Sequence, residues 1–157
     1  MKRLAAIDIF RRALFSLLAC SAMAAAAADY PPMQVLLETD RTVAGETLRF
    51  PDKPPAKVSA VIITIEPGQS TGWHRHGTPL FAYVLSGALE VEYEGVGRFA
   101  YKAGDAFLEA MQVSHSGTVV SAEAARLLAV YMEGEGSVKT IVAAPTYSAA
   151  PGNPSPR

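Results

Sequence analysis

The sequence predicts an all-β fold, an antiparallel sandwich or barrel made of short strands. Short runs rich in β-branched, aromatic and aliphatic residues alternate with glycine-containing turns. After residue 28, no segment is long and periodic enough for an amphipathic helix. Closely spaced strands without intervening helices favour a sandwich or barrel. The chain has 157 residues and is 50% apolar, which is enough for one compact core and too little for two.

The apolar runs give the expected strands in chain order. They are 58–66, 81–86, 88–94, 98–102, 106–109, 127–132 and 138–142. Segments 33–39 and 46–50 are expected to add edge strands. Ser86-Gly87 and the stretch 94–97 are predicted to be hairpin turns, and 103–105 another tight reversal, because glycine permits the backbone conformations that such turns need.

The first 28 residues have the pattern of a secretory signal peptide. Lys2, Arg3, Arg11 and Arg12 precede an apolar run that ends in an alanine tract at Ala28. This run, 13–28, is shorter than the roughly 20 apolar residues that span a bilayer. We therefore expect cleavage rather than a membrane-spanning or amphipathic helix, and a periplasmic or secreted mature protein with no transmembrane segment.

Cys20 is the only cysteine and leaves a second route open. The sequence Leu-Leu-Ala-Cys at 17–20 also fits a lipoprotein processing site, which would make a lipid-bearing Cys20 the mature N-terminus. After cleavage at Ala28 the protein has no cysteine, so no disulfide supports the fold. The mature chain has 10 basic and 14 acidic residues. This mildly acidic balance argues against a nucleic-acid partner.

The chain is thus divided into four parts. Residues 1–28 are the signal peptide, 29–57 contain N-terminal strands and a linker, and 58–143 form the barrel. The tail 144–157, rich in proline, serine and glycine, is expected to be disordered.

All three histidines of the chain belong to one pattern. His74 and His76 flank Arg75, and His115 follows 39 residues after His76. Side chains alternate between faces along a strand, so His74 and His76 point the same way if this segment is extended. Two imidazoles on one face form half of a metal site, and a closed barrel would bring His115 to them.

The same alternation sorts the neighbouring residues. Leu80, Ala82 and Val84 should share the inner face with the histidines and leave a pocket, because most are small. Three aromatic residues and Arg75 should face the other way. The aromatic residues are Trp73, Phe81 and Tyr83, which we expect to pack in the sandwich or at a dimer contact; Arg75 is either solvated or contacts an anion at the barrel mouth.

From Val58 to Met132 the chain resembles the cupin family. The first cupin motif, Gly-x5-His-x-His-x3-Glu-x6-Gly, matches in spacing at Gly68, His74, His76, Leu80 and Gly87. The second motif, Gly-x5-Pro-x-Gly-x2-His-x3-Asn, matches in spacing at Gly104, Ala110, Gln112, His115 and Val119. Four residues depart from the motifs, and the most consequential is Leu80, at the position where the family has a glutamate ligand.

The resemblance implies a small double-stranded β-helix, the jelly-roll or cupin barrel, with a divalent metal bound by His74, His76 and His115. Imidazole ligands suit iron, copper, nickel and zinc better than manganese, which prefers oxygen. Similarity to three-histidine cupin dioxygenases favours iron. It also implies a small-molecule ligand or substrate, and we expect a homodimer.

Glu109 lies in the otherwise apolar run 106–111. A carboxylate in such surroundings needs a partner. Four roles are open: an acceptor that orients a histidine or a pocket donor, a direct metal ligand, a catalytic base, or simple surface exposure. Glu109 is our candidate catalytic residue.

Three functions remain open from the sequence. The first is an exported metal-dependent enzyme, similar to a non-haem iron dioxygenase, that acts on a small organic molecule. The second is a small-molecule-binding module without catalysis, for a ligand such as a sugar or organic acid, in which the histidines hold a structural metal or none. The third is a lipid-tethered envelope protein that starts at Cys20. The fold alone does not choose among them.

Overall fold

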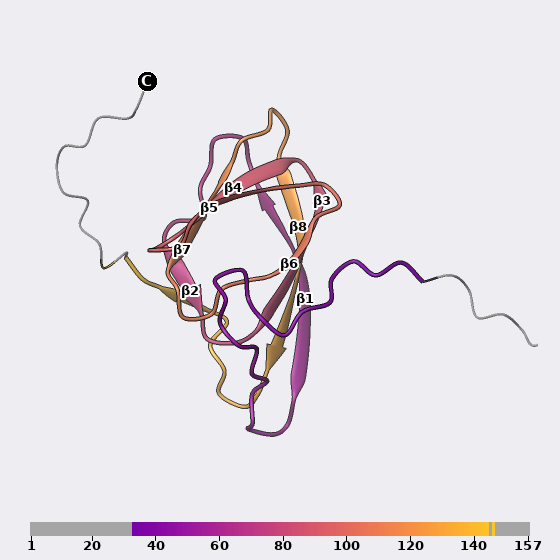
Figure 1. The fold of residues 1–157 in the computed structure, drawn as a ribbon, viewed down its shortest axis with the longest axis vertical. Helices are drawn as coiled ribbons and strands as arrows, with labels where there is room; N and C mark the ends of the chain where they lie inside the picture. Colours follow the sequence, from indigo (N-terminus) through magenta and orange to yellow (C-terminus); the bar gives the residue numbers. More distant parts are fainter. Residues whose placement is uncertain (1–32, 145, 147–157) are drawn as a thin grey trace, which may run out of the picture. The chain divides into compact units, whose positions relative to one another are not determined.

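The computed structural model describes residues 33–144 and 146, which contain nine β-strands and no helix. No helix in that part of the chain is therefore long and apolar enough to cross a membrane. The predicted signal peptide with Cys20 and nearly all of the predicted tail lie outside the described residues. Figure 1 shows the strands as two sheets that face each other.

The two sheets are antiparallel and together form the jelly-roll barrel of an all-β protein. The four-stranded sheet has the order β1-β8-β3-β6, with β1 at Lys57–Ile65, β8 at Ala125–Glu133, β3 at Leu80–Ser86 and β6 at Ala106–Leu108. The five-stranded sheet has the order β5-β4-β7-β2-β9, with β5 at Gly97–Lys102, β4 at Ala88–Tyr93, β7 at His115–Val119, β2 at His74–His76 and β9 at Thr140–Val142.

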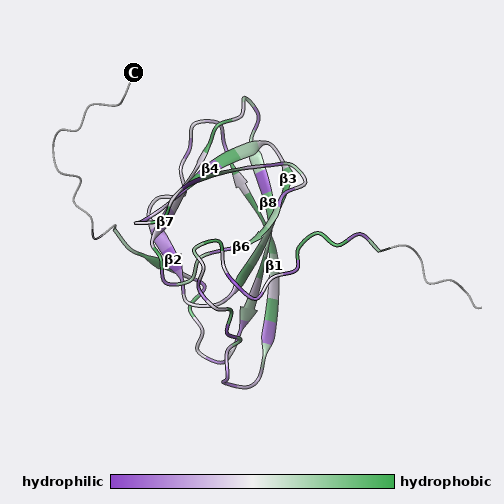
Figure 2. Cartoon of the chain, in the orientation of Figure 1, coloured by the Kyte–Doolittle hydropathy of each residue, from purple (hydrophilic) through white to green (hydrophobic). Residues whose placement is uncertain are grey.

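The core lies between the sheets and follows from strand alternation. Every second residue of β3, β4 and β8 is buried, including Val84, Val91 and Ala129. These strands carry much of the apolar character in Figure 2, whereas β2 is a short hydrophilic strand. Both sheets therefore contribute apolar side chains to the core, and the sheet that bears the histidines packs against it.

Each of the seven runs predicted as strands contains a strand, with ends shifted by a few residues. The two predicted N-terminal strands, 33–39 and 46–50, do not form. Only a single bridge joins Arg41 to Thr47 in this region. Instead, the Glu46 carboxylate accepts hydrogen bonds from the backbone N–H groups of Met111 and Gln112, both at 2.7 Å. The segment thus acts as a clasp on the loop before His115.

The predicted hairpin at Ser86-Gly87 is wrong, because β3 and β4 belong to different sheets. Gly87 is a corner at which the chain crosses between them. Its φ is +74°, and a Cβ atom there would lie 2.6 Å from the Ala124 carbonyl oxygen, so only glycine fits. The stretch after Tyr93 does form the predicted hairpin, and β4 pairs with β5 from Tyr93 and Gly97 onward.

Candidate metal centre

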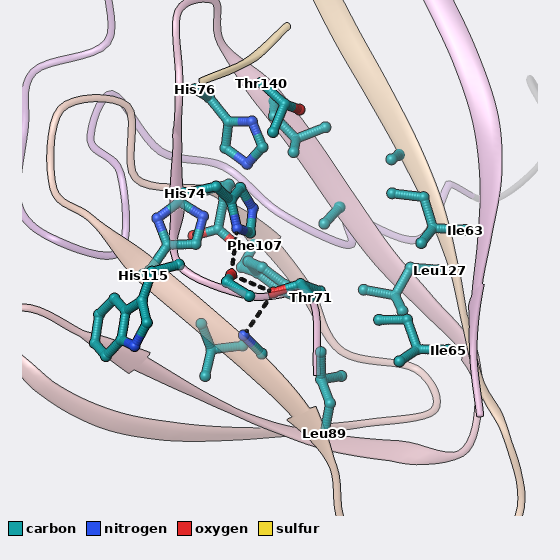
Figure 3. Close-up of a pocket in the computed structure, with 18 of the residues that line it drawn as sticks. Ile63, Ile65, Thr71, His74, His76, Leu89, Phe107, His115, Leu127 and Thr140 are labelled. Carbon is teal, nitrogen blue, oxygen red and sulfur yellow. Dashed lines mark hydrogen bonds and ion pairs between the residues drawn. The ribbon is translucent and has the colours of Figure 1, made fainter. Parts of the chain in front are cut away.

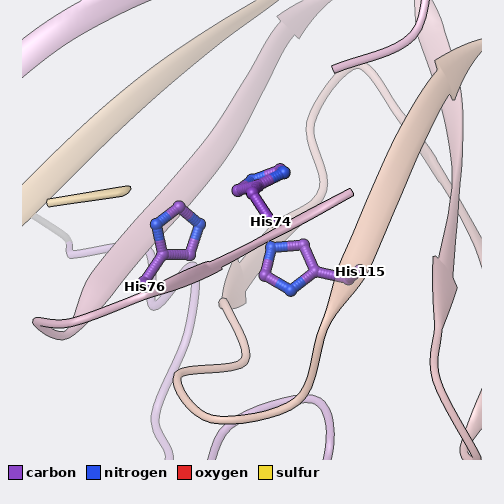
Figure 4. A group of neighbouring side chains, drawn as sticks. All are labelled: His74, His76 and His115. Carbon is purple, nitrogen blue, oxygen red and sulfur yellow. The ribbon is translucent and has the colours of Figure 1, made fainter. Parts of the chain in front are cut away.

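The three histidines converge at one place in the five-stranded sheet (Figure 4). His74 on β2 lies directly opposite His115 on β7 in the antiparallel ladder. His76 is two residues further along β2, on the same face. One ligand nitrogen from each ring lies within 4.8 Å of the other two. The fold therefore brings together the three residues predicted as metal ligands.

Each imidazole is oriented by the backbone through its Nδ1 atom. His74, His76 and His115 are hydrogen-bonded to the carbonyl oxygens of Gly72, Lys139 and Val113, at 2.9, 3.0 and 2.9 Å. A carbonyl only accepts, so each Nδ1 carries the proton and each Nε2 presents a lone pair. This is the arrangement in which outer hydrogen bonds orient metal-binding histidines.

The buried Nε2 atom of His115 has no hydrogen-bond partner within the described structure. An unsatisfied buried nitrogen is costly in a folded protein. A cation that accepts lone pairs would satisfy it, together with the Nε2 atoms of His74 and His76. The three-histidine group thus fits a transition metal by its donor atoms.

Burial keeps the three imidazoles neutral. It lowers the pKa of His74, His76 and His115, and that of His76 falls to about 4. Metal binding requires an unprotonated imidazole nitrogen. At neutral pH the three rings are already in that form, so no proton has to leave them before a metal binds.

A chain of hydrogen bonds through Thr71 fixes the carbonyl group that orients His74. The N–H of Gly117 on β7 donates to the Thr71 hydroxyl at 3.0 Å, and that hydroxyl donates to the Gly72 carbonyl at 3.0 Å. The same carbonyl accepts from His74 Nδ1. Figure 3 draws these bonds around Thr71. Thr71 thus links the orientation of His74 to strand β7.

Glu109 is buried beside the histidines, with 7% of its surface exposed, so the interpretation as a surface residue is wrong. Its Oε1 lies 3.8 Å from His115 Nε2 and accepts the Ala110 N–H at 2.8 Å. Burial raises the pKa of Glu109 to about 7, although hydrogen bonds from Tyr93 and Ala110 act in the opposite direction. The carboxylate is not part of the group of atoms that lie within 4.8 Å of one another.

A cavity of about 370 Å³ opens on the three histidines and Glu109. Leu80 and Ala82 line it, as strand alternation predicted, whereas Val84 is buried in the core beyond it. Phe81, Tyr83 and Arg75 are not among the lining residues. Trp73 does line the cavity, contrary to prediction. β2 begins only at His74, so strand alternation does not extend to Trp73.

Sequence reasoning missed two residues that steady the site, Thr71 and Glu46. Thr71 precedes the first histidine by three residues, and its side chain acts only through the Gly72 carbonyl. Glu46 acts on a loop 65 residues away in sequence. The only local signal for Thr71 was its position beside Gly72, just before the His-x-His segment. Nothing local distinguishes Glu46.

Comparison with known proteins identifies the family. Residues 61–131 match the family described as "Cupin domain" (Cupin_2). This range contains both predicted motifs, all three histidines and Glu109. The two sheets and the converging histidines agree with that match, so the chain belongs to the cupin superfamily. No curated protein sequence matches the chain.

Several solved structures are similar to the chain over about half its length. A Lactobacillus farciminis oxalate decarboxylase in a formate complex is 22% identical over 54% of this chain, with a TM-score of 0.48. A Bacillus subtilis oxalate decarboxylase with Mn(II) centres is 22% identical over 52%, with a TM-score of 0.46. A structure of DMSP lyases is 15% identical over 55%, with a TM-score of 0.49. The match spans only 26%, 23% and 44% of those chains.

Removing one imidazole should abolish tight metal binding. We expect His76→Ala and His115→Ala, each purified after growth with added iron, to lose nearly all bound metal by elemental analysis, because two neutral nitrogens hold a divalent ion poorly. Gln112→Ala is the control, since that side chain is exposed in the loop before His115. Wild-type metal content in both histidine variants would contradict the ligand assignment.

Thr71→Val should weaken metal binding without removing it. The variant keeps the shape of the side chain but loses the hydroxyl that ties the Gly72 carbonyl to Gly117. We expect about a ten-fold loss of affinity in a competition titration with a chelator, at the low end for partners that orient ligands. Thr71→Ser keeps the hydroxyl and should retain wild-type affinity. Equal losses in both variants would point to packing of the methyl group instead.

Proposed function

We propose that this protein is an exported cupin enzyme that uses a divalent metal, iron in the first place, to act on a small organic molecule in the manner of a dioxygenase. Zinc, nickel and copper are alternatives that the same imidazole ligands accept. The observation that supports this most strongly is that one ring nitrogen of each histidine lies within 4.8 Å of the other two, while every Nδ1 is bound to a backbone carbonyl.

The chain itself would supply binding, orientation and a proton acceptor. His74, His76 and His115 would hold the ion as three neutral ligands. A bound iron would supply open coordination positions at which dioxygen and an oxygen atom of the substrate are activated. The lining around the histidines is mostly apolar, which would reduce the amount of water beside the reacting groups.

Glu109 is the residue that we propose for proton transfer. It is the carboxylate that lines the cavity, and Ala110 and Tyr93 hold it in place. A carboxylate with a raised pKa can take and return a proton near neutral pH. Because it lies outside the group of converging ligand atoms, we assign it to the substrate's proton rather than to the metal.

The assembly and location of the protein belong to the same proposal. Strand β1 is an edge strand with exposed apolar side chains, among them Val58 (69%), Val61 (40%) and Ile62 (48%). An apolar edge of this kind is often covered by another subunit, which supports the expected homodimer. The basic and apolar pattern of residues 1–28 supports export.

Export can be tested on the full chain produced in a Gram-negative host. We expect mass spectrometry of the periplasmic fraction to give Asp29 as the first residue, because cleavage follows the alanine tract. The variant Cys20→Ala should give the same mature mass. A lipid-bearing Cys20 would instead establish the tethered form, and a cytoplasmic protein that starts at Met1 would overturn export altogether.

The enzyme proposal predicts a separable role for Glu109. Protein from its native compartment should contain about one iron per chain and consume oxygen with at least one member of a panel of small oxygen-bearing organic compounds. Glu109→Gln should keep the iron and lose the oxygen uptake, because the amide accepts no proton. Glu90→Gln, on the exposed face of β4, is the matched control.

Other results would redirect the assignment. Loss of iron in Glu109→Gln would make this residue a metal ligand. A protein that binds small molecules with no oxygen uptake, with or without metal, would be the binding module.

A further inference from the structure

The cavity is divided into a polar end and an apolar end. Figure 3 shows the histidines on one side and Ile63, Ile65 and Leu127 on the opposite side. The volume of about 370 Å³ is within the roughly 300–1,000 Å³ range of small-molecule sites. The aliphatic side chains come from β1 and β8 of the four-stranded sheet. A bound molecule therefore meets chemically different surfaces at its two ends.

The polar groups of the cavity gather near the histidines. Thr140 lies opposite His76 in the β2–β9 ladder, and the Tyr131 ring is 6.0 Å from the His76 ring. Thr71 is bonded to the carbonyl that holds His74. Glu109 approaches His115. The opposite wall offers only hydrocarbon, from Ile63, Ile65 and Leu127. Leu89 and Phe107 add to the apolar lining.

The cavity also lacks a positive side chain for an anionic substrate body. Among the described residues that line it, none is a lysine or an arginine. Lys139 lies over the Tyr131 ring but is not among the lining residues, and its Nζ forms an ion pair with the Glu133 carboxylate at 3.6 Å. A carboxylate, phosphate or sugar hydroxyl pressed against the far wall would lose water without gaining a partner.

We propose that the substrate is a small molecule with an oxygen-bearing head and an uncharged hydrocarbon body, and that sugars and dicarboxylates are excluded. The head lies at the histidines and the body against Ile63, Ile65 and Leu127. This inference rests on the proposed function for the head, which a metal would bind. Selection of the body rests only on the aliphatic wall, so the two can fail separately.

The test uses two probes of equal shape on the full mature chain loaded with cobalt(II). Both are hydroxamates, whose two oxygen atoms bind metals. In 4-methylpentanohydroxamate the chain ends in an isopropyl group, and in succinate monohydroxamate a carboxylate takes its place. Acetohydroxamate provides the head alone. The visible spectrum of cobalt reports binding of the head.

We expect the isopropyl probe to bind at least ten-fold more tightly than acetohydroxamate, since each fully buried carbon contributes about four-fold. The carboxylate probe should bind no more tightly than acetohydroxamate. Ile63→Lys should remove this preference, because it places a cation in the aliphatic wall. Thr64→Lys, at the next position of β1 and exposed, should keep it. Equal or tighter binding of the carboxylate probe to the wild-type protein overturns the inference, and that comparison needs no variant.

A second measurement works without metal. Trp73 is the only tryptophan of the chain and lines the cavity, so its fluorescence reports occupancy. In metal-free protein, 4-methylpentanamide should change this fluorescence at concentrations at least ten-fold below those needed for succinamate. If cobalt does not bind, the proposed function fails, while this amide pair still decides the inference. If cobalt binds and neither pair shows a preference, the inference alone is overturned.

Discussion

The pairing of the three-residue strand β2 with its two neighbours is the constraint on which the candidate site depends. β7 places His115 opposite His74, and β9 places Thr140 opposite His76. The chain that leads into β9 also supplies the Lys139 carbonyl that orients His76. Three segments far apart in sequence are thus held in one register, and a slip of one residue would turn the imidazoles out of the cavity.

The position of the carboxylate shows how the ladder allows a site to change its composition. Leu80 occupies the family's glutamate position, but Glu109 lies across from it, and the Glu109 N–H donates to the Leu80 carbonyl at 2.8 Å. Both side chains line the same cavity. The carboxylate of this chain therefore lies one position across the ladder from the family's glutamate, beside His115 and hydrogen-bonded by Tyr93, but outside the group of converging histidine nitrogens.

The fold was largely predictable because apolar alternation and glycine spacing are local signals. Strands β3, β4 and β8 follow directly from them. β7 does not, because His115, Ser116 and Gly117 lack the β-branched run that marks a strand, and pairing alone makes it one. The corner at Gly87 was mistaken for a hairpin since alternation does not say to which sheet a strand belongs.

The same distinction holds within the site. The spacing of the histidines predicted their convergence, and apolar flanks predicted that Glu109 needs partners. The identity of those partners depends on contacts between distant segments, as does the hydroxyl link through Thr71. The prediction for Trp73 was wrong because the alternation was extended to the residue before β2 begins.

The hydrogen bonds of the Glu46 clasp show that residues before the family match help to hold the candidate site. The family match starts at residue 61, yet the Glu46 carboxylate and the bond from the Val43 N–H to the Leu108 carbonyl, at 2.9 Å, secure the two ends of the segment that carries Glu109. A fragment cut at the family boundary would retain every candidate ligand and lose the brace. The N–H groups of Met111 and Gln112 would then be hydrogen-bonded to water, and the loop before His115 would be less restrained. The unit that holds the candidate site is therefore longer than the segment that matches the family.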